Sequence, residues 1–72
     1  MLSPSKAILE YLRREYPAGC RVELLEMHDM QAPPVGTHGT VVGVDDIGSV
    51  MVRWDNGSSL SLLYNEDRFR RV

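Results

Sequence analysis

The first hydrophobic pattern along the chain has the period of an α-helix. Apolar side chains recur on one helical face at Ile8, Leu9, Leu12 and Tyr16. Ser3 offers a capping oxygen and Pro4 has the φ of a first helical turn, whereas Pro17 disfavours helical geometry at the residue before it. These signals predict a helix over residues 4–15.

After Pro17 the pattern changes to alternation of apolar and polar side chains, which is typical of half-buried strands. Val50, Val52 and Trp54 give the clearest example, and we expect these three side chains to face the core. The strands that this alternation and the neighbouring turns predict cover residues 20–26, 40–44, 50–55, 60–62 and 69–72.

Turn residues separate these strands and shape the sheet. Gly43 inside the second strand predicts a bulge or a strong bend. Asn56-Gly57 is a strong signal for a tight hairpin because both residues tolerate positive φ, and residues 64–67 predict another turn. Short strands with tight turns favour a closed or nearly closed barrel over a flat sheet, whose edges would be exposed.

Length, charge and cysteine content narrow the possible functions. The chain has 72 residues, which is enough for one domain, so we expect one domain over residues 1–72 with a barrel over residues 20–72 behind the helix. A net charge of −2 disfavours general nucleic-acid binding. Cys20 is the single cysteine, which favours a reducing cytoplasm as the setting of the protein. The sequence has no long apolar run, so we expect no signal peptide and no membrane span.

Four stretches of sequence are distinctive. They are Pro-Pro-Val-Gly-Thr-His-Gly-Thr-Val at 33–41, Val-Asp-Asp-Ile-Gly at 44–48, Val-Arg-Trp-Asp-Asn-Gly-Ser-Ser-Leu at 52–60 and Glu-Asp-Arg-Phe-Arg at 66–70. Together they resemble a family of short bacterial proteins of unknown function that occur in phages, plasmids and integrative elements. The resemblance covers about residues 16–72 and leaves out the N-terminal helix. It implies a phage or mobile-element setting and no assigned activity.

A looser resemblance concerns the fold alone. The Gly-x-x-Gly-Thr-Val strand, the acidic turn and the Val-x-Trp strand look like the SH3-like barrels of the KOW and translation-factor type. This resemblance implies a mainly β fold, a small five-stranded SH3-like barrel preceded by one short N-terminal α-helix. It also implies binding of protein or RNA through the barrel loops, by analogy of fold.

The titratable residues do not match a catalytic or metal site. His28, Asp29 and His38 include two imidazoles and a carboxylate, but their spacing matches no known zinc site. The acidic turn at 45–46 and Asp55 lie at opposite ends of one predicted strand, roughly 20 Å apart, so they cannot share an ion. No serine lies where a histidine can be predicted nearby as its base, so the sequence shows no nucleophile-and-base set. We therefore predict a protein that is not an enzyme and that has no metal or cofactor.

Candidate partner-binding residues fall in the loops and in the basic C-terminal segment. We expect the loop over residues 28–35 and the turn over residues 45–48 to form the mouth of the barrel, and the helix face with Arg13 and Arg14 to add contacts. The individual candidates are His28, Asp29, Met30, Asp45, Asp46, Tyr64, Arg68, Arg70 and Arg71.

Three functions of different classes fit these candidates. The leading hypothesis is a non-catalytic protein-binding module of a phage or mobile element, and one version of it is an acidic inhibitor of a host defence nuclease. The first alternative is a nucleic-acid-binding module that uses Tyr64 and the arginines of residues 68–71. The second alternative is a structural role in which the apolar stripe of the helix pairs with another copy of the chain.

Overall fold

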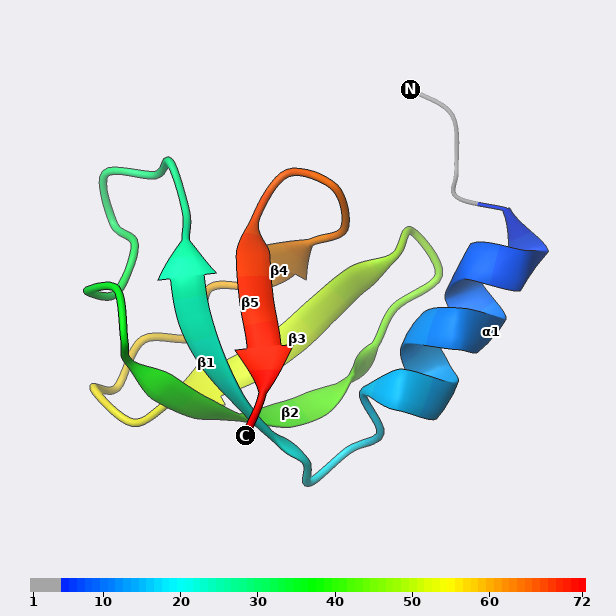
Figure 1. The fold of residues 1–72 in the computed structure, drawn as a ribbon, viewed down its shortest axis with the longest axis horizontal. Helices are drawn as coiled ribbons and strands as arrows, with labels where there is room; N and C mark the ends of the chain where they lie inside the picture. Colours follow the sequence, from blue (N-terminus) through cyan, green and yellow to red (C-terminus); the bar gives the residue numbers. More distant parts are fainter. Residues whose placement is uncertain (1–4) are drawn as a thin grey trace.

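The computed structural model describes residues 5–72 and contains one helix and one five-stranded antiparallel sheet (Figure 1). The predicted mainly β fold with an N-terminal helix is therefore confirmed. In chain order, the elements are α1 (Lys6–Glu15), β1 (Arg21–Glu26), β2 (His38–Val44), β3 (Ser49–Trp54), β4 (Leu62–Leu63) and β5 (Arg68–Arg71).

Helix α1 packs its apolar stripe onto the sheet of its own chain. Its capping residue is Ser5, whose Oγ accepts a hydrogen bond from the Ile8 amide at 3.2 Å. The predicted capping signals, at residues 3–4, lie outside the described residues, and the helix begins two residues later than predicted. Leu12 is fully buried, and Ile8 and Tyr16 pack against the core. No helix formed by residues 5–72 is long and apolar enough to cross a membrane.

The sheet has the strand order β4-β3-β2-β1-β5, with every neighbouring pair antiparallel. One register shift lies between Val41 and Gly43 in β2, which confirms the predicted irregularity at Gly43, and another lies between Leu24 and Glu26 in β1. Such bulges bend a sheet and increase its twist. The curved sheet does not close: within residues 5–72, β4 and β5 each pair on one side only.

The tight turn predicted at Asn56-Gly57 is present, but the strand that follows it begins later than expected. The Trp54 carbonyl accepts the Gly57 amide at 3.0 Å, the Trp54 amide donates to Ser58 at 2.9 Å, and of the Asn56-Gly57 pair only Gly57 has a positive φ, of 94°. Leu60 was expected in the fourth strand, but its carbonyl instead accepts the indole N–H of Trp54 at 2.8 Å. Strand β4 is therefore reduced to two residues.

The core lies on the concave side of the sheet, beneath α1. Its buried apolar side chains are Leu12, Val22, Leu24, Val41, Val50, Val52, Trp54 and Leu62. The predicted inward row of β3 is confirmed, since each of its three side chains is at most 2% exposed. Gly39 of β2 lies directly against this row, and a Cβ atom there would come within 2.5 Å of Val52 Cγ1 and 2.8 Å of Trp54 Cε3.

We predict that Gly39→Ala destabilises the fold by about 2–3 kcal/mol, because overpacking a filled core displaces side chains from their rotamers. Urea unfolding followed by the fluorescence of Trp54 measures the change. Gly43→Ala is the matched control, since a Cβ there meets only Met51 Cε, at an ordinary 3.5 Å. Equal stability losses in the two variants would contradict the packing that we describe.

Candidate functional site

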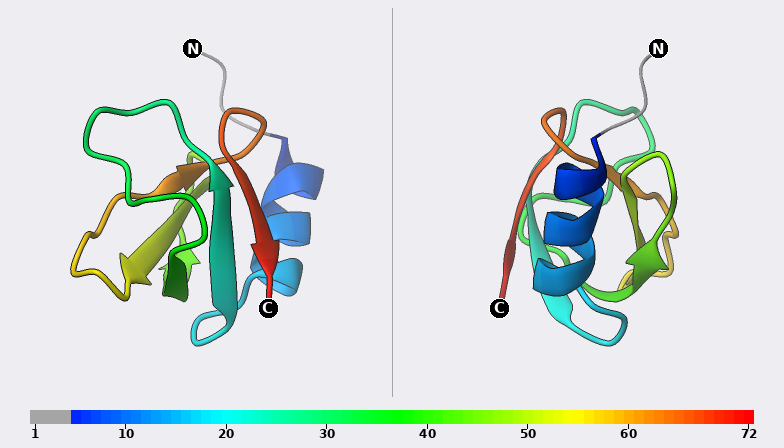
Figure 2. Two further views of the ribbon diagram at one scale, coloured as in Figure 1. Left: turned by 60° about the vertical axis from the view of Figure 1, so that its left-hand side comes forward. Right: turned by 90° about the vertical axis from the view of Figure 1, so that its right-hand side faces the viewer.

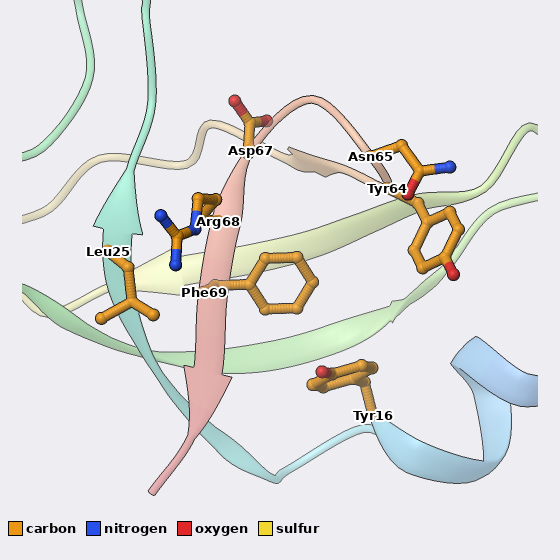
Figure 3. Close-up of a pocket in the computed structure, with 7 residues that line it drawn as sticks. All are labelled: Tyr16, Leu25, Tyr64, Asn65, Asp67, Arg68 and Phe69. Atoms are coloured by element: carbon orange, nitrogen blue, oxygen red, sulfur yellow. The ribbon is translucent and has the colours of Figure 1, made fainter.

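A pocket of about 420 Å³ lies around β5, and the residues that line it stand on both sides of this strand (Figure 3). We call this opening between β5, the β4–β5 turn and the end of α1 the seam. The residues that line the pocket are Tyr16, Leu25, Tyr64, Asn65, Asp67, Arg68 and Phe69. In the right-hand view of Figure 2, α1 lies between the β1 and β5 strands and the β2–β3 hairpin, so the helix partly fills the opening that the sheet leaves.

Nearly all aromatic side chains of the chain gather at the seam. The Tyr16 and Phe69 rings lie 5.0 Å apart, and the Tyr11 and Tyr64 rings meet edge to face at 6.3 Å. These are the three tyrosines and the single phenylalanine of the sequence, and the remaining aromatic residue is the core residue Trp54. Tyr11 and Tyr64 are 39% and 38% exposed. The seam therefore offers large apolar faces with polar hydroxyl ends, a combination that is enriched at protein interfaces.

The β4–β5 turn holds Tyr64 in place through its backbone. The Leu63 carbonyl accepts the amides of Glu66 and Asp67 at 3.1 and 3.0 Å, and the Asp67 carboxylate accepts the Leu63 amide at 2.8 Å. Asn65 has a φ of 69°, a left-handed conformation that asparagine tolerates. Tyr64 thus projects from a tight turn, where few of its conformations are lost on binding.

The predicted basic cluster is largely neutralised by the neighbouring strand. Arg70 contacts the Glu23 carboxylate at 2.6 Å, and Arg68 lies 4.0 Å from that of Glu26. These are cross-strand pairs of opposite charge between β5 and β1, which stabilise an antiparallel pairing. In the part of the chain that the structure describes, Arg71 has no carboxylate within 4 Å.

The long first loop carries three of the predicted contacts. His28 Nε2 lies 2.9 Å from a Glu26 carboxylate oxygen, and the Asp29 side chain accepts the Gln31 amide at 2.7 Å. Met30 is fully exposed. Across residues 5–72, no three histidine, cysteine, aspartate or glutamate side chains come together in a group that could hold a metal ion.

Both carboxylates of the acidic turn between β2 and β3 make hydrogen bonds within the chain. The Asp45 carboxylate accepts the amides of Ile47 and Ser49 at 3.1 and 2.8 Å, which closes the turn. Asp46 accepts a hydrogen bond of 2.8 Å from Arg13 of the helix. Figure 1 places this turn beside α1 and the first loop on the far side of β5, so the predicted single mouth formed by both loops is wrong. The bend of the sheet carries the two loops apart.

Burial raises the pKa of two titratable groups near the seam. Burial, followed by the nearby Tyr11 and Glu15, raises the pKa of the Tyr16 hydroxyl above its ordinary 10.0. Burial also raises the pKa of the Cys20 thiol, so it is not the thiolate that a nucleophilic cysteine requires. The Tyr16 hydroxyl is thus a neutral group that can donate and accept a hydrogen bond.

The structure brings together only some of the predicted site residues. Tyr64 and Arg68 line the same pocket, whereas the first loop and the acidic turn lie elsewhere. Tyr11, Tyr16 and Phe69 were absent from the predicted site. For Tyr11 a signal existed, because it is an aromatic residue on α1 outside the apolar stripe. The partnership of Tyr16 with Phe69 depends on the position of β5 and has no signal in the sequence.

The comparison with known families adds a classification. A family described as a domain of unknown function, DUF4314, matches residues 5–72. The chain belongs to this family. The DUF4314 match includes α1, whereas the resemblance seen in the sequence began only at about residue 16, so the helix is part of the family's domain. None of the curated proteins matches the chain.

An ion pair away from the seam gives a pH-dependent prediction. Arg21 donates to both carboxylate oxygens of Asp55, at 2.8 and 2.5 Å, and this hydrogen bonding holds the pKa of Asp55 below its ordinary 3.8. A carboxyl group with a lowered folded-state pKa stabilises the fold above its unfolded pKa. That contribution is lost as the pH falls through the folded-state value.

We therefore predict that Asp55→Asn lowers the free energy of unfolding at pH 7. Below about pH 4, the free energy of unfolding of this variant should decrease less steeply with falling pH than that of the parent. Urea titrations at neutral and acidic pH measure both effects. Glu66→Gln, at an exposed side chain, is the control and should follow the parent curve. An Asp55→Asn curve parallel to that of the parent at every pH would contradict the assignment.

Proposed function

We propose that this DUF4314 domain is a non-catalytic protein-binding module whose contact surface is the aromatic seam. In this proposal the curved sheet is an SH3-like barrel that stays open along one side, and the protein acts in the cytoplasm in the service of a phage or mobile element. The observation that carries the proposal is the gathering of Tyr16, Tyr64 and Phe69 around one pocket, with Tyr11 packed edge to face against Tyr64. Aromatic anchors of this kind dominate the binding energy of protein interfaces.

The charges support a protein partner over a nucleic acid. Nucleic-acid affinity comes chiefly from cations that are free to replace counterions on phosphates. Here Arg68 and Arg70 face glutamates of β1, Arg13 contacts Asp46, and the net charge is −2. A nucleic-acid-binding module that used residues 68–71 would first have to break these pairs. Nucleic-acid binding is therefore less favoured than protein binding.

The two narrower hypotheses receive different support. Inhibition of a host nuclease was inferred from acidic turns, yet Asp45 closes its own turn and Asp46 contacts Arg13, so these turns lend it no support. Self-association through the helix stripe requires exposed apolar residues. Leu12 is fully buried in the core of its own chain, and Ile8 and Tyr16 pack against that core, so most of the stripe is already covered.

We predict that Tyr64→Ala weakens capture of the protein partner at least about tenfold without unfolding the domain, because truncating an interface anchor costs more than about 1.4 kcal/mol. The measurement is affinity capture from a bacterial host lysate with the tagged chain, followed by mass spectrometry and titration of the captured protein. Ile47→Ala is the matched control, since Ile47 is an exposed apolar residue on the β2–β3 turn. Circular dichroism checks that both variants fold.

Two results would reject the proposal. The first is capture of the same protein to the same extent by the parent and by Tyr64→Ala. The second is a lysate that yields no protein partner while single-stranded DNA or RNA shifts the domain in a gel in a salt-dependent manner.

A further inference from the structure

The outer edge of β5 carries backbone groups without partners. The Val72 amide donates to the Arg21 carbonyl at 3.1 Å, and Glu23 and Leu24 lie opposite Arg70 and Phe69. Hydrogen-bonded and non-hydrogen-bonded pairs alternate along an antiparallel ladder. The backbone groups of Arg70 and Val72 therefore bond to β1. The N–H and C=O groups of Phe69 and Arg71 point away from β1, toward the free edge. Among residues 5–72, none of these four groups has a hydrogen-bond partner.

This free edge runs along the aromatic pocket. In Figure 3 the Phe69 ring extends from β5 on the side away from β1, toward Tyr64 and Tyr16. The edge therefore offers two kinds of contact in one place. The backbone of β5 presents donors and acceptors at the spacing of a strand, and the pocket beside it accepts an apolar side chain.

We propose that the protein partner binds by adding an extended, acidic segment to β5 as a sixth strand, with an apolar side chain opposite Phe69. This inference rests on the proposed protein-binding function and specifies how the partner is recognised. Binding by strand addition derives affinity from main-chain hydrogen bonds and specificity from alternate side chains.

The charges of β5 select the acidic character of the segment. Side chains alternate across a strand, so Arg68 and Arg70 share one face of β5, and Phe69 and Arg71 share the other. Strand β1 already places glutamates opposite Arg68 and Arg70. A new strand on the free edge lies next to the same arginines and next to Arg71, which has no carboxylate within 4 Å in the described chain. An acidic residue opposite Arg71 meets a cation without a carboxylate partner in the described chain, acidic residues opposite Arg68 and Arg70 share those arginines with Glu26 and Glu23, and an apolar residue suits the position of Phe69.

A second copy of the chain does not fit the same edge. Two β5 strands could pair antiparallel through the free backbone groups of Phe69 and Arg71, and such pairing has three possible registers. These registers set Arg70 against Arg70, Arg68 against Arg70, or Arg71 against Arg71. Like charges directly opposite each other destabilise a strand pair, so the arginines protect the edge from self-pairing and leave it open to an acidic strand.

The test uses the full chain, labelled with ¹⁵N, and a synthetic peptide as the probe. The peptide has the core Glu-Glu-Val-Glu, with serine at each end and blocked termini. In the proposed register its valine lies opposite Phe69, so the valine N–H bonds to β5 and the N–H of the preceding glutamate points to solvent. We expect saturable binding at millimolar peptide and amide hydrogen exchange at Phe69 and Arg71 slowed about tenfold or more.

Modified peptides and variants sharpen the test. We expect N-methylation of the valine to weaken binding about tenfold, and N-methylation of the preceding glutamate to change it less than about threefold. A lysine-for-glutamate peptide should not bind. Arg71→Glu should weaken binding of the acidic peptide about tenfold, whereas Arg53→Glu, an exposed change of the same charge on β3, should leave it unchanged.

Absence of saturable binding, equal effects of the two N-methylations, or unchanged exchange at Phe69 and Arg71 would overturn strand addition. These outcomes are distinct from failure of the proposed function. If the captured protein partner depends on Tyr64 but leaves the exchange of Phe69 and Arg71 unchanged, protein binding stands and strand addition is rejected. If the host lysate yields no protein partner while single-stranded DNA or RNA shifts the domain in a salt-dependent manner, the proposed function is rejected.

Discussion

The burial of Trp54 is the constraint on which the rest of the structure depends. Its ring packs against Gly39, where a side chain would not fit, and its indole N–H donates to the Leu60 carbonyl. Strand β4 begins only two residues after this contact, at Leu62, and has two residues. So short a strand offers little backbone for β5 to pair with. The sheet curves around its core and remains open.

The opening has consequences for function. Helix α1 buries Leu12 beneath the opening and places Tyr11 and Tyr16 beside it, where they meet Tyr64 and Phe69. A closed barrel would have satisfied the outer edge of β5 and filled this space. In the open form, aromatic faces and free backbone groups are presented side by side. In the proposed mode of binding, the arginines that disfavour pairing with another copy of the chain also favour an acidic partner.

Much of the fold follows from local pattern, and most of the site does not. Alternation along residues 50–54 identified the inward row of β3, and Gly43 identified a bulge, because both depend on neighbouring residues in one strand. The open sheet and the hydrogen bond between Trp54 and Leu60 are not reported by any local pattern. Likewise, the contact of Tyr16 with Phe69 joins residues 53 positions apart, since 69 − 16 = 53. The acidic turn was identified as a turn, but its contact with Arg13 depends on where the helix lies.

The most direct test of the open sheet is amide hydrogen exchange of the free protein, resolved residue by residue along β5. The N–H groups of Arg70 and Val72 bond to β1, whereas those of Phe69 and Arg71 face the seam. The account predicts slow exchange at Arg70 and fast exchange at Phe69 and Arg71, alternating along a single strand. Equal protection of Phe69, Arg70 and Arg71 would show that the edge is already paired, and would contradict the account.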